Sequence, residues 1–269
     1  MTRLGATHPT LGKCTVAHGK LKQGYHRALE THLAHSEYHG YPTYLLDHSI
    51  IEGLWTKEAA LLEVVLDQLS KPEGERLHWL FWFDADTVVM NREIPLEAFL
   101  PPADREDVHL LYTKDWNGLN NGVFILRVST WSLEMLSSIL AYRTFKPDEE
   151  LAFTEQTAME RVIAMPKYRD NVVQCPPQWF NAYPGEHTEE LDGRTVHFGH
   201  KAGQLLVHFA GVGDKDKAIR EWVDKLKGNR SAWEIDLFET TYPAQIEAFW
   251  EGLKREKEMS EDPRKEFWG

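Results

Sequence analysis

The sequence of 269 residues is poor in cysteine, in long apolar runs and in positive charge. Its two cysteines, Cys14 and Cys175, exclude a disulfide framework and a cysteine-rich zinc site, but leave a single bridge between them open. The longest unbroken apolar run, residues 79–83, is far shorter than the roughly 20 residues of a membrane-spanning helix. With 42 acidic and 30 basic residues, the net charge of -12 argues against nucleic acid as a partner.

Several sequence signals are also absent. The first ten residues lack the basic start, apolar stretch and cleavage site of a signal peptide, so we expect a cytosolic protein or one whose targeting segment is missing from this chain. No serine- and glycine-rich linker and no repeat divides the chain. The chain has no Gly-x-Gly-x-x-Gly, no Gly-Lys-Ser/Thr loop and no Gly-x-Ser-x-Gly, which argues against dinucleotide oxidoreductases, P-loop enzymes and serine hydrolases.

The residues that are present predict one folded α/β domain. Hydrophobic residues make up 42% and aromatic residues 12% of the chain, far from the composition of disordered proteins. Short apolar runs alternate with segments of helical period, which predicts a mixed or parallel sheet covered by helices. We expect strands at 43–46, 77–83, 109–112, 123–126, 172–174 and 205–209, and helices at 57–69, 131–142, 155–164 and 215–227. The first of these helices would have one apolar face, made of Leu61, Leu62, Val65, Leu66 and Leu69. Expected helix N-caps are Thr56, Ser129, Thr154 and Asp214. Residues 115–122 read as a turn-rich loop of functional composition, and residues 254–266 as a solvated helix or frayed end.

Asp84-Ala85-Asp86 is the sharpest local feature, because two carboxylates follow the most apolar predicted strand. Open α/β sheets bind ligands at the carboxyl ends of their strands. Two acids beside aromatic residues need cationic partners or a metal ion, since an unpartnered buried carboxylate is costly. From these residues alone, a divalent metal site and a capping or salt-bridged turn both stay open.

His208 ends another apolar run and is followed by Gly211 and Gly213, where a backbone could approach a phosphate. A histidine at such a point is either a hydrogen-bonded core residue or a metal ligand. His197 and His200 have the spacing of two zinc ligands, but no cysteine or His-Glu-x-x-His segment accompanies them, so we discard a zinc site there.

Read in order, four blocks of the sequence resemble glycosyltransferase family 34, which contains fungal α-galactosyl- and α-mannosyltransferases and plant xyloglucan xylosyltransferases. They are Tyr38-His39-Gly40-Tyr41 with Trp55-Thr56-Lys57; Phe81-Trp82-Phe83-Asp84-Ala85-Asp86-Thr87-Val88-Val89-Met90-Asn91; Leu119-Asn120-Asn121-Gly122-Val123-Phe124-Ile125-Leu126-Arg127 with Trp131-Ser132; and His208-Phe209-Ala210-Gly211. The resemblance covers roughly residues 25–227, and the order of the blocks makes it specific.

The resemblance implies a GT-A-like, Rossmann-like domain with a mixed central sheet flanked by helices, over residues 1–230. Residues 231–269 would then form a C-terminal helical extension, packed on the domain or trailing from it. It also implies a UDP- or GDP-linked sugar donor and a Mn²⁺ or Mg²⁺ ion held by Asp84, Asp86 and His208. Oxygen ligands with an imidazole suit such an ion, which would neutralise charge on the departing diphosphate.

The family retains anomeric configuration, and the resemblance makes Glu155 and Gln156 candidate catalytic groups facing the sugar. Developing positive charge at the anomeric carbon would be stabilised by such an oxygen. The family usually has one or two Asp before the Gln, whereas this chain has Thr154-Glu155-Gln156. A purely structural alternative is that Glu155 favours the helix N-terminus electrostatically.

Five further residues are candidate contacts for the nucleotide-sugar donor: Lys57, Asn120, Asn121, Gly211 and Lys215. The two asparagines can instead belong to a structural turn, and Lys57 can instead be solvated on the first turn of a helix. The family commonly has a Cys and a Lys after the His-Phe-x-Gly block, whereas this chain has Val212 and Gly213 there and Lys215 slightly later. Trp116, Trp179 and Phe180 are candidate platforms for an acceptor sugar, with Trp116 preferred.

The predicted function is a metal-dependent, retaining transfer of a hexose, galactose or mannose, from a nucleotide sugar to a glycan acceptor hydroxyl in α linkage. The alternatives are an inactive scaffold or glycan-binding subunit and, less favoured, a metal-dependent hydrolase. Other transferase subunits or a second copy of the chain are expected protein partners. The family resemblance predicts the Golgi lumen, with which the sequon Asn229-Arg230-Ser231 agrees; a soluble cytoplasmic relative is the alternative.

Overall fold

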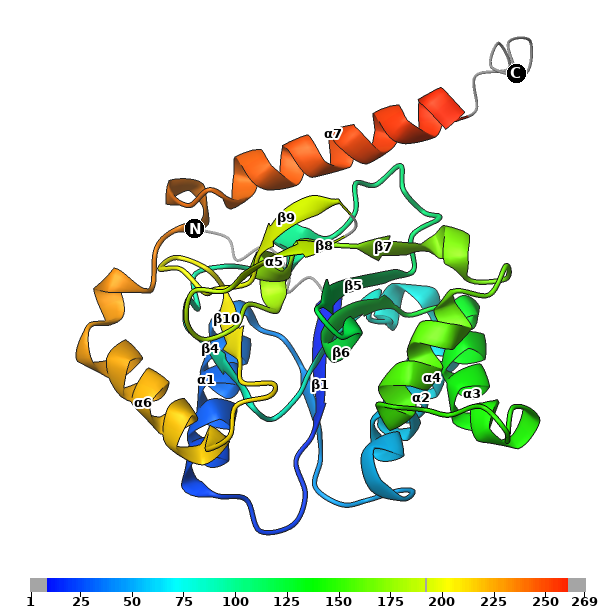
Figure 1. Cartoon of the computed structure of the whole chain (residues 1–269), viewed down its shortest axis with the longest axis horizontal. Coiled ribbons are helices and arrows are strands. Elements are labelled where there is room, and N and C mark those ends of the chain that lie inside the picture. The colour runs from blue at the N-terminus through cyan, green and yellow to red at the C-terminus, as the bar shows by residue number, and fades with distance from the viewer. Residues whose placement is uncertain (1–8, 192, 261–269) are drawn as a thin grey trace.

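The computed structural model describes residues 9–191 and 193–260 and has a six-stranded mixed sheet at its centre (Figure 1). The strand order is β2-β1-β3-β6-β5-β7. Only β6 runs against both of its neighbours, while β1 pairs in parallel with β2 and β3, and β5 with β7. The bounds are Leu11–Val16 (β1), Thr43–Leu46 (β2), Trp79–Phe83 (β3), Leu110–Asp115 (β5), Gly118–Arg127 (β6) and Val172–Gln174 (β7). The α/β class with a mixed sheet is therefore as the sequence predicted.

Strand β3 is buried on both faces, as its unalternating apolar sequence predicts. Trp79, Phe81 and Phe83 point into one core cluster, and Leu80 and Trp82 into a second cluster on the opposite face. Burying one such side chain contributes about 2–3 kcal/mol. This strand therefore anchors the sheet and fixes the position of the acids that follow it.

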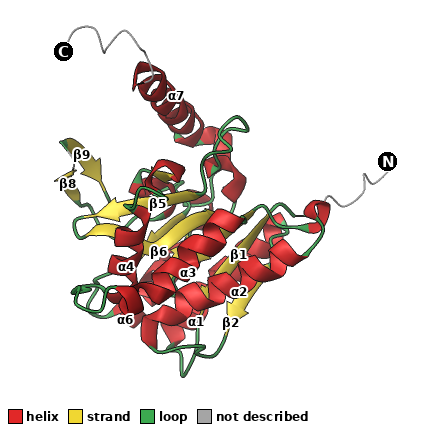
Figure 2. Cartoon of the chain, turned by 90° about the vertical axis from the view of Figure 1, so that its right-hand side faces the viewer, coloured by secondary structure: helices red, strands yellow, loops and turns green. Residues whose placement is uncertain are grey.

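Helices cover both faces of the sheet (Figures 1 and 2). One group, α2 (Thr56–Ser70), α3 (Thr130–Phe145) and α4 (Thr154–Ile163), closes the second cluster. Another, α1 (Gln23–His39) and α6 (Lys215–Gly228), packs against a two-stranded antiparallel sheet formed by β4 (Thr87–Val89) and β10 (Leu206–His208). The remaining elements are the short helix α5 (Pro177–Phe180), the hairpin of β8 (Thr188–Leu191) and β9 (Arg194–His197), and the long helix α7 (Tyr242–Ser260).

Four details of the sequence interpretation are wrong. Thr56 does not cap α2, because a 3₁₀ turn at Gly53–Trp55 leads directly into the helix and the Thr56 hydroxyl donates to the Ile51 carbonyl. Thr154 is the first residue of α4, with a φ of 48°, and Phe153 occupies the N-cap position instead. Leu66, placed on the buried face of α2, is 50% exposed. Residues 118–122 belong to β6, so the expected loop shrinks to a tight hairpin turn.

The two other predicted helix N-caps are confirmed. Ser129 accepts a hydrogen bond from the Ser132 amide at the start of α3, and Asp214 accepts one from the Lys217 amide at the start of α6. Both cysteines are buried free thiols, so they form no bridge. Residues 254–260 continue α7, whose Phe249 and Trp250 reach the first core cluster; residues 261–266 lie outside the described part. The domain boundary at residue 230 stays a prediction. Among the described residues, none of the helices combines the length and apolarity needed to span a bilayer.

Candidate active site

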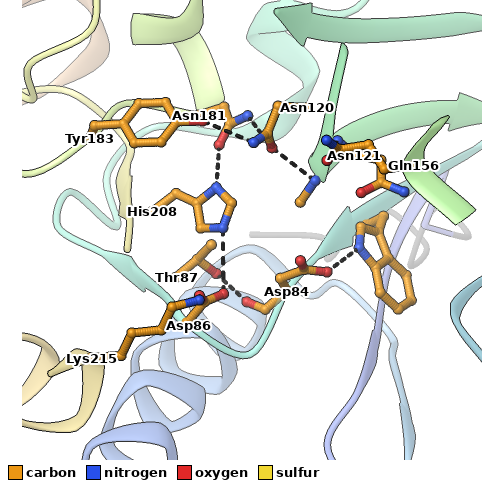
Figure 3. A network of polar contacts seen from close by, with 12 residues as sticks. Asp84, Asp86, Thr87, Asn120, Asn121, Gln156, Asn181, Tyr183, His208 and Lys215 are labelled. Atoms are coloured by element: carbon orange, nitrogen blue, oxygen red, sulfur yellow. Dashed lines mark hydrogen bonds and ion pairs between the residues drawn. The ribbon is translucent and has the colours of Figure 1, made fainter. Parts of the chain in front are cut away.

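Two acids and a histidine meet where β3 ends and the small β4-β10 sheet begins. One carboxylate oxygen each of Asp84 and Asp86 and one ring nitrogen of His208 lie within 4.8 Å of one another. The Asp84 amide donates to the Gly122 carbonyl at 2.8 Å, and the Thr87 hydroxyl donates to the Asp84 carbonyl at 2.7 Å. The turn between β3 and β4 is therefore held in place from both sides, and Figure 3 shows His208 facing it.

Asp86 is a buried carboxylate between two cationic or hydrogen-bonding groups. Its Oδ1 is 3.4 Å from His208 Nε2, and its Oδ2 accepts from Lys215 Nζ at 2.5 Å. Burial raises the pKa of Asp86, but the attraction of His208, when its ring is protonated, and of the Lys215 ammonium outweighs burial and leaves that pKa well below its usual range. Asp86 is therefore charged at neutral pH and available as an oxygen ligand.

The cluster fits a hard divalent ion. Two carboxylates and an imidazole form a donor set that Mn²⁺ accepts and Mg²⁺ tolerates. Space beside the histidine depends on Gly122, because a Cβ at that position would lie 2.2 Å from His208 Cε1 and 2.9 Å from its Nε2. The missing side chain of Gly122 keeps the region around the ligand nitrogen open.

Lys57 is a buried link between β3, β6 and α4. Its Nζ lies 3.1 Å from Asp84 Oδ1 and 3.0 Å from both the carbonyl and Oδ1 of Asn121. Glu155 Oε1 is 3.7 Å away. Burial lowers the pKa of Lys57, but the carboxylates of Asp84 and Glu155 outweigh burial, so the pKa is raised and the ammonium stays charged.

Glu155 and Gln156 begin α4 beside the same strand. Glu155 is 2% exposed and its Oε1 accepts from Asn121 Nδ2 at 3.4 Å. Gln156 is partly exposed, and its Oε1 accepts from the Asn121 amide at 3.2 Å. Both candidates therefore sit within one network with Lys57, with Gln156 as the more accessible of the two.

A cavity of about 620 Å³ opens over this network, large enough for a small-molecule ligand. Its walls include part of the loop after β1, from Val16 to Tyr25, and the tip before α4, from Ala152 to Gln156. Of the residues expected to contact a ligand, six line it together with Gln156: Lys57, Asp84, Asp86, Asn121, Glu155 and Lys215.

Three expected residues lie elsewhere. Asn120 is 5% exposed and its amide contacts Asp115 and Tyr183 within the protein. Gly211 follows β10 at a φ of 72°, a conformation suited to glycine, and does not line the cavity. Trp116 is 42% exposed at the hairpin tip between β5 and β6, among Tyr183, His187 and Phe198.

The expectation that Trp179 and Phe180 offer acceptor platforms is wrong. They are 1% and 0% exposed and pack against Phe99 in the first core cluster. The next residue, Asn181, is the one in that segment that reaches the candidate site, because its side chain contacts His208 (Figure 3). Sequence reasoning missed it, together with Thr113 and Tyr183, because only the fold brings Asn181 and Tyr183 to the histidine and Thr113 to Asn181.

Comparisons with known proteins agree with this geometry. Residues 101–218 match the galactosyl transferase GMA12/MNN10 family, a segment that contains Gln156 and His208 but begins after Asp86. An uncharacterized alpha-1,2-galactosyltransferase of Schizosaccharomyces pombe is 27% identical over 58% of this chain and 46% of its own length. An alpha-1,2-galactosyltransferase of the same organism is 26% identical over 66% of this chain and 53% of its own length. The chain spans about half the length of these curated relatives.

A solved structure supports the fold. A glycosyltransferase involved in the glycosylation of the major capsid of PBCV-1 matches with a TM-score of 0.59 and 16% identity, over 79% of this chain and 100% of that chain. Over residues 101–218 the chain is thus similar to the galactosyl transferase GMA12/MNN10 family, in agreement with the resemblance of its sequence motifs, and it has a GT-A type of fold.

Proposed function

We propose that this protein transfers a hexose from a nucleotide-diphosphate sugar to a glycan hydroxyl, with retention and in α linkage. The observation that carries the proposal is the convergence of Asp84, Asp86 and His208 in a GT-A type of fold, with both acids lining the cavity and the buried His208 beside them. The names of the fungal relatives favour galactose as the sugar.

Asp84, Asp86 and His208 would hold a divalent ion, Mn²⁺ or Mg²⁺. When bound, that ion supplies positive charge to the diphosphate of a UDP- or GDP-linked sugar as it departs. Lys215 brings a second cation to the same cavity at the first turn of α6. Lys57 keeps Asp84 and Asn121 in fixed positions, because its ammonium contacts both.

The sugar would lie beside the start of α4. An oxocarbenium-like transition state carries positive charge, which a nearby oxygen stabilises. Gln156 Oε1 is the accessible oxygen there, and Glu155 behind it contributes negative charge held by Lys57. In this proposal Gln156 faces the anomeric carbon and Glu155 orients Asn121. Trp116 is the proposed stacking surface for the acceptor, since sugar rings pack on aromatic faces.

Donor cleavage tests the proposal. Purified protein is incubated with Mn²⁺ and, separately, UDP-galactose, GDP-mannose, UDP-glucose, UDP-xylose and UDP-N-acetylglucosamine, and release of nucleoside diphosphate is followed with and without EDTA and a mannoside acceptor. We expect chelator-sensitive release from one donor, increased by acceptor. Sugar delivered only to water would identify a hydrolase instead.

Paired variants locate the chemistry. Asp86→Asn should lower release by about 100-fold or more. Asp170→Asn, which alters a side chain that is 81% exposed, should leave release unchanged. A folded wild-type protein that neither cleaves any donor nor binds a nucleotide would contradict the proposal and favour the scaffold alternative. The Golgi lumen stays a family-based proposal, tested by imaging the tagged protein in its own cells.

A further inference from the structure

Asn181 follows α5 and is completely buried, yet its side chain makes three contacts that belong to the candidate site. Its Oδ1 lies 2.8 Å from His208 Nδ1. Its Nδ2 lies 2.7 Å from Thr113 Oγ1 and 3.0 Å from Asn120 Oδ1. No residue of this amide network other than His208 belongs to the metal cluster.

The orientation of both amides follows from one backbone group. The Gly122 amide can only donate, and it points at Asn120 at 2.9 Å, so the atom it meets must be the carbonyl oxygen of that side chain. The other end of the Asn120 amide then carries the hydrogens, in agreement with its contact to Asp115 Oδ2 at 2.9 Å.

The orientation of the Asn120 amide fixes the orientation of the Asn181 amide, which in turn fixes the hydrogen position on His208. Because Asn120 Oδ1 accepts, the Asn181 atom 3.0 Å from it must be the NH₂ group. The remaining Asn181 atom is therefore the oxygen, and His208 Nδ1 must donate a hydrogen to it. In a neutral imidazole with Nδ1–H, the lone pair lies on Nε2, which faces Asp86 Oδ1 at 3.4 Å.

We infer that Asn181 is a positioning residue that holds His208 in its Nδ1–H form and so turns the Nε2 lone pair toward a metal ion beside Asp84 and Asp86. Thr113 and Asn120 hold Asn181 in the required orientation. The inference deepens the proposed function and rests on it for the metal ion, but the hydrogen position on His208 is a property of the chain alone. Groups that orient a ligating histidine typically contribute a factor of 10 to 100 to metal affinity.

The hydrogen position can be measured directly. Nitrogen-15 NMR of histidine-labelled, metal-free protein at alkaline pH distinguishes the two neutral forms of each imidazole, and the His208→Gln variant assigns the His208 signals by their absence. We expect Nδ1–H in the wild-type protein. We expect loss of that preference in Asn181→Leu, which replaces the amide by an apolar side chain of similar size. An Nε2–H form in the wild type would overturn the inference even if the protein proves to be an active enzyme.

Metal affinity gives the second readout. Calorimetric titration with Mn²⁺ in the presence of UDP should show Asn181→Leu binding the ion on the order of 10- to 100-fold more weakly than wild type. Thr113→Val, which removes only the hydroxyl behind Asn181, should weaken binding less, and Asn171→Ala, whose side chain contacts the Asp107 carbonyl far from His208, should not change it. If Asn181→Leu does not fold, Thr113→Val and the wild-type spectrum carry the test.

The outcomes separate the two proposals. A folded Asn181→Leu that binds Mn²⁺ as tightly as wild type would overturn the role of Asn181. A wild-type protein with the Nδ1–H form but no affinity for Mn²⁺ would instead contradict the proposed metal-dependent function. The hydrogen bond between Asn181 and His208 would then still exist, but it would not serve metal binding.

Discussion

At the scale of single residues, the candidate site depends on the missing side chain of Gly122 as much as on the side chains that could bind a metal ion. The Cβ of an alanine there would lie 2.2 Å from His208 Cε1, well inside contact distance. His208 is 3% exposed and is held by Asn181, so it has little room to retreat. The strand would have to shift or the imidazole would have to turn away from Asp86.

We therefore predict that Gly122→Ala folds with a loss of about 1–3 kcal/mol of stability and binds Mn²⁺ at least about tenfold more weakly. Thermal unfolding and calorimetric titration measure the two effects. Gly213→Ala is the matched control, because a Cβ at Gly213 meets no atom within 4 Å. Equal Mn²⁺ affinity in Gly122→Ala and wild type would show that the site tolerates the clash.

Part of the site could be predicted from the sequence. Asp84 and Asp86 stand directly after an unbroken apolar run, and His208 ends another, so local pattern and family motif agreed on all three. Asn181 and Thr113 gave no such signal, because a buried amide or hydroxyl acquires its role only from partners distant in sequence. Trp179 and Phe180, which precede Asn181, are predicted from the sequence as platforms for a sugar, but buried aromatic residues pack in the core more often than they bind a ligand.

At the scale of elements, Lys57 connects three segments that surround the cavity. Its ammonium joins the end of β3 through Asp84, strand β6 through Asn121 and helix α4 through Glu155. A third acid, Glu58, lies in the same turn of α2 with both carboxylate oxygens buried and without hydrogen-bond partners. Burial raises the pKa of Glu58 to about 8, so this acid is neutral over most of the physiological range.

We predict that Lys57→Met destabilises the protein by about 3 kcal/mol, because the change leaves the buried carboxylate of Glu155 without its cation. Urea unfolding monitored by circular dichroism gives the value. Lys217→Met, on the exposed side of α6, should change stability by less than about 0.5 kcal/mol. A Lys57→Met variant as stable as the control would mean that the contacts of Lys57 with Asp84 and Glu155 do not stabilise the folded protein.

Whether the sequence predicted an element depended on how apolar the buried positions of that element are. Strand β3 carries continuous apolar residues and helix α6 periodic ones with a clear N-cap, and the sequence placed both to within two residues. For β6 the sequence predicted only residues 123–126, because the polar residues of its first half read as a loop. Strand β1 contains the buried Lys13, and helix α1 turns His32 and His35 inward, so both lack the apolar pattern by which buried elements are found. His32 instead stacks on Phe83, with ring centroids 3.7 Å apart.

At the scale of the whole molecule, buried histidines link folding to pH. Burial, with Lys13 adding repulsion, holds the pKa of His32 and His35 well below 6.5, and burial lowers the pKa of His200 to about 4. Because these groups bind protons more readily when unfolded, their contribution is present above pH 6.5 and is lost as the pH falls toward 4. Glu58, with its raised pKa, acts in the opposite sense between pH 4.5 and 8.

Three histidines outweigh one carboxyl, so the free energy of unfolding should fall as the pH is lowered from 6.5 to 4.5. Each histidine contributes about 1.4 kcal/mol per pH unit once the pH is clearly below 6.5. Denaturant unfolding at a series of pH values measures the slope. Glu58→Gln should steepen it, and His48→Gln, at a side chain that is 68% exposed, should leave it unchanged. A flat or rising profile toward acid would contradict this assignment.

The α/β class followed from alternation along the chain, whereas the GT-A type of fold came from the family motifs. The periodicity of apolar residues does not give the order of strands in a sheet. The placement of β1, β3 and β6 side by side depends on contacts between segments that are far apart in sequence. In the proposed function, the choice of donor sugar would likewise depend on side chains that the fold assembles around the cavity.

The most direct test of the account is a crystal structure of the protein grown with Mn²⁺ and UDP, with anomalous diffraction recorded to locate manganese. We predict one strong peak bonded to Asp84, Asp86 and His208, with the nucleotide in the cavity beside Lys215. Manganese absent from this cluster while UDP occupies the cavity, or manganese bound only elsewhere, would contradict it.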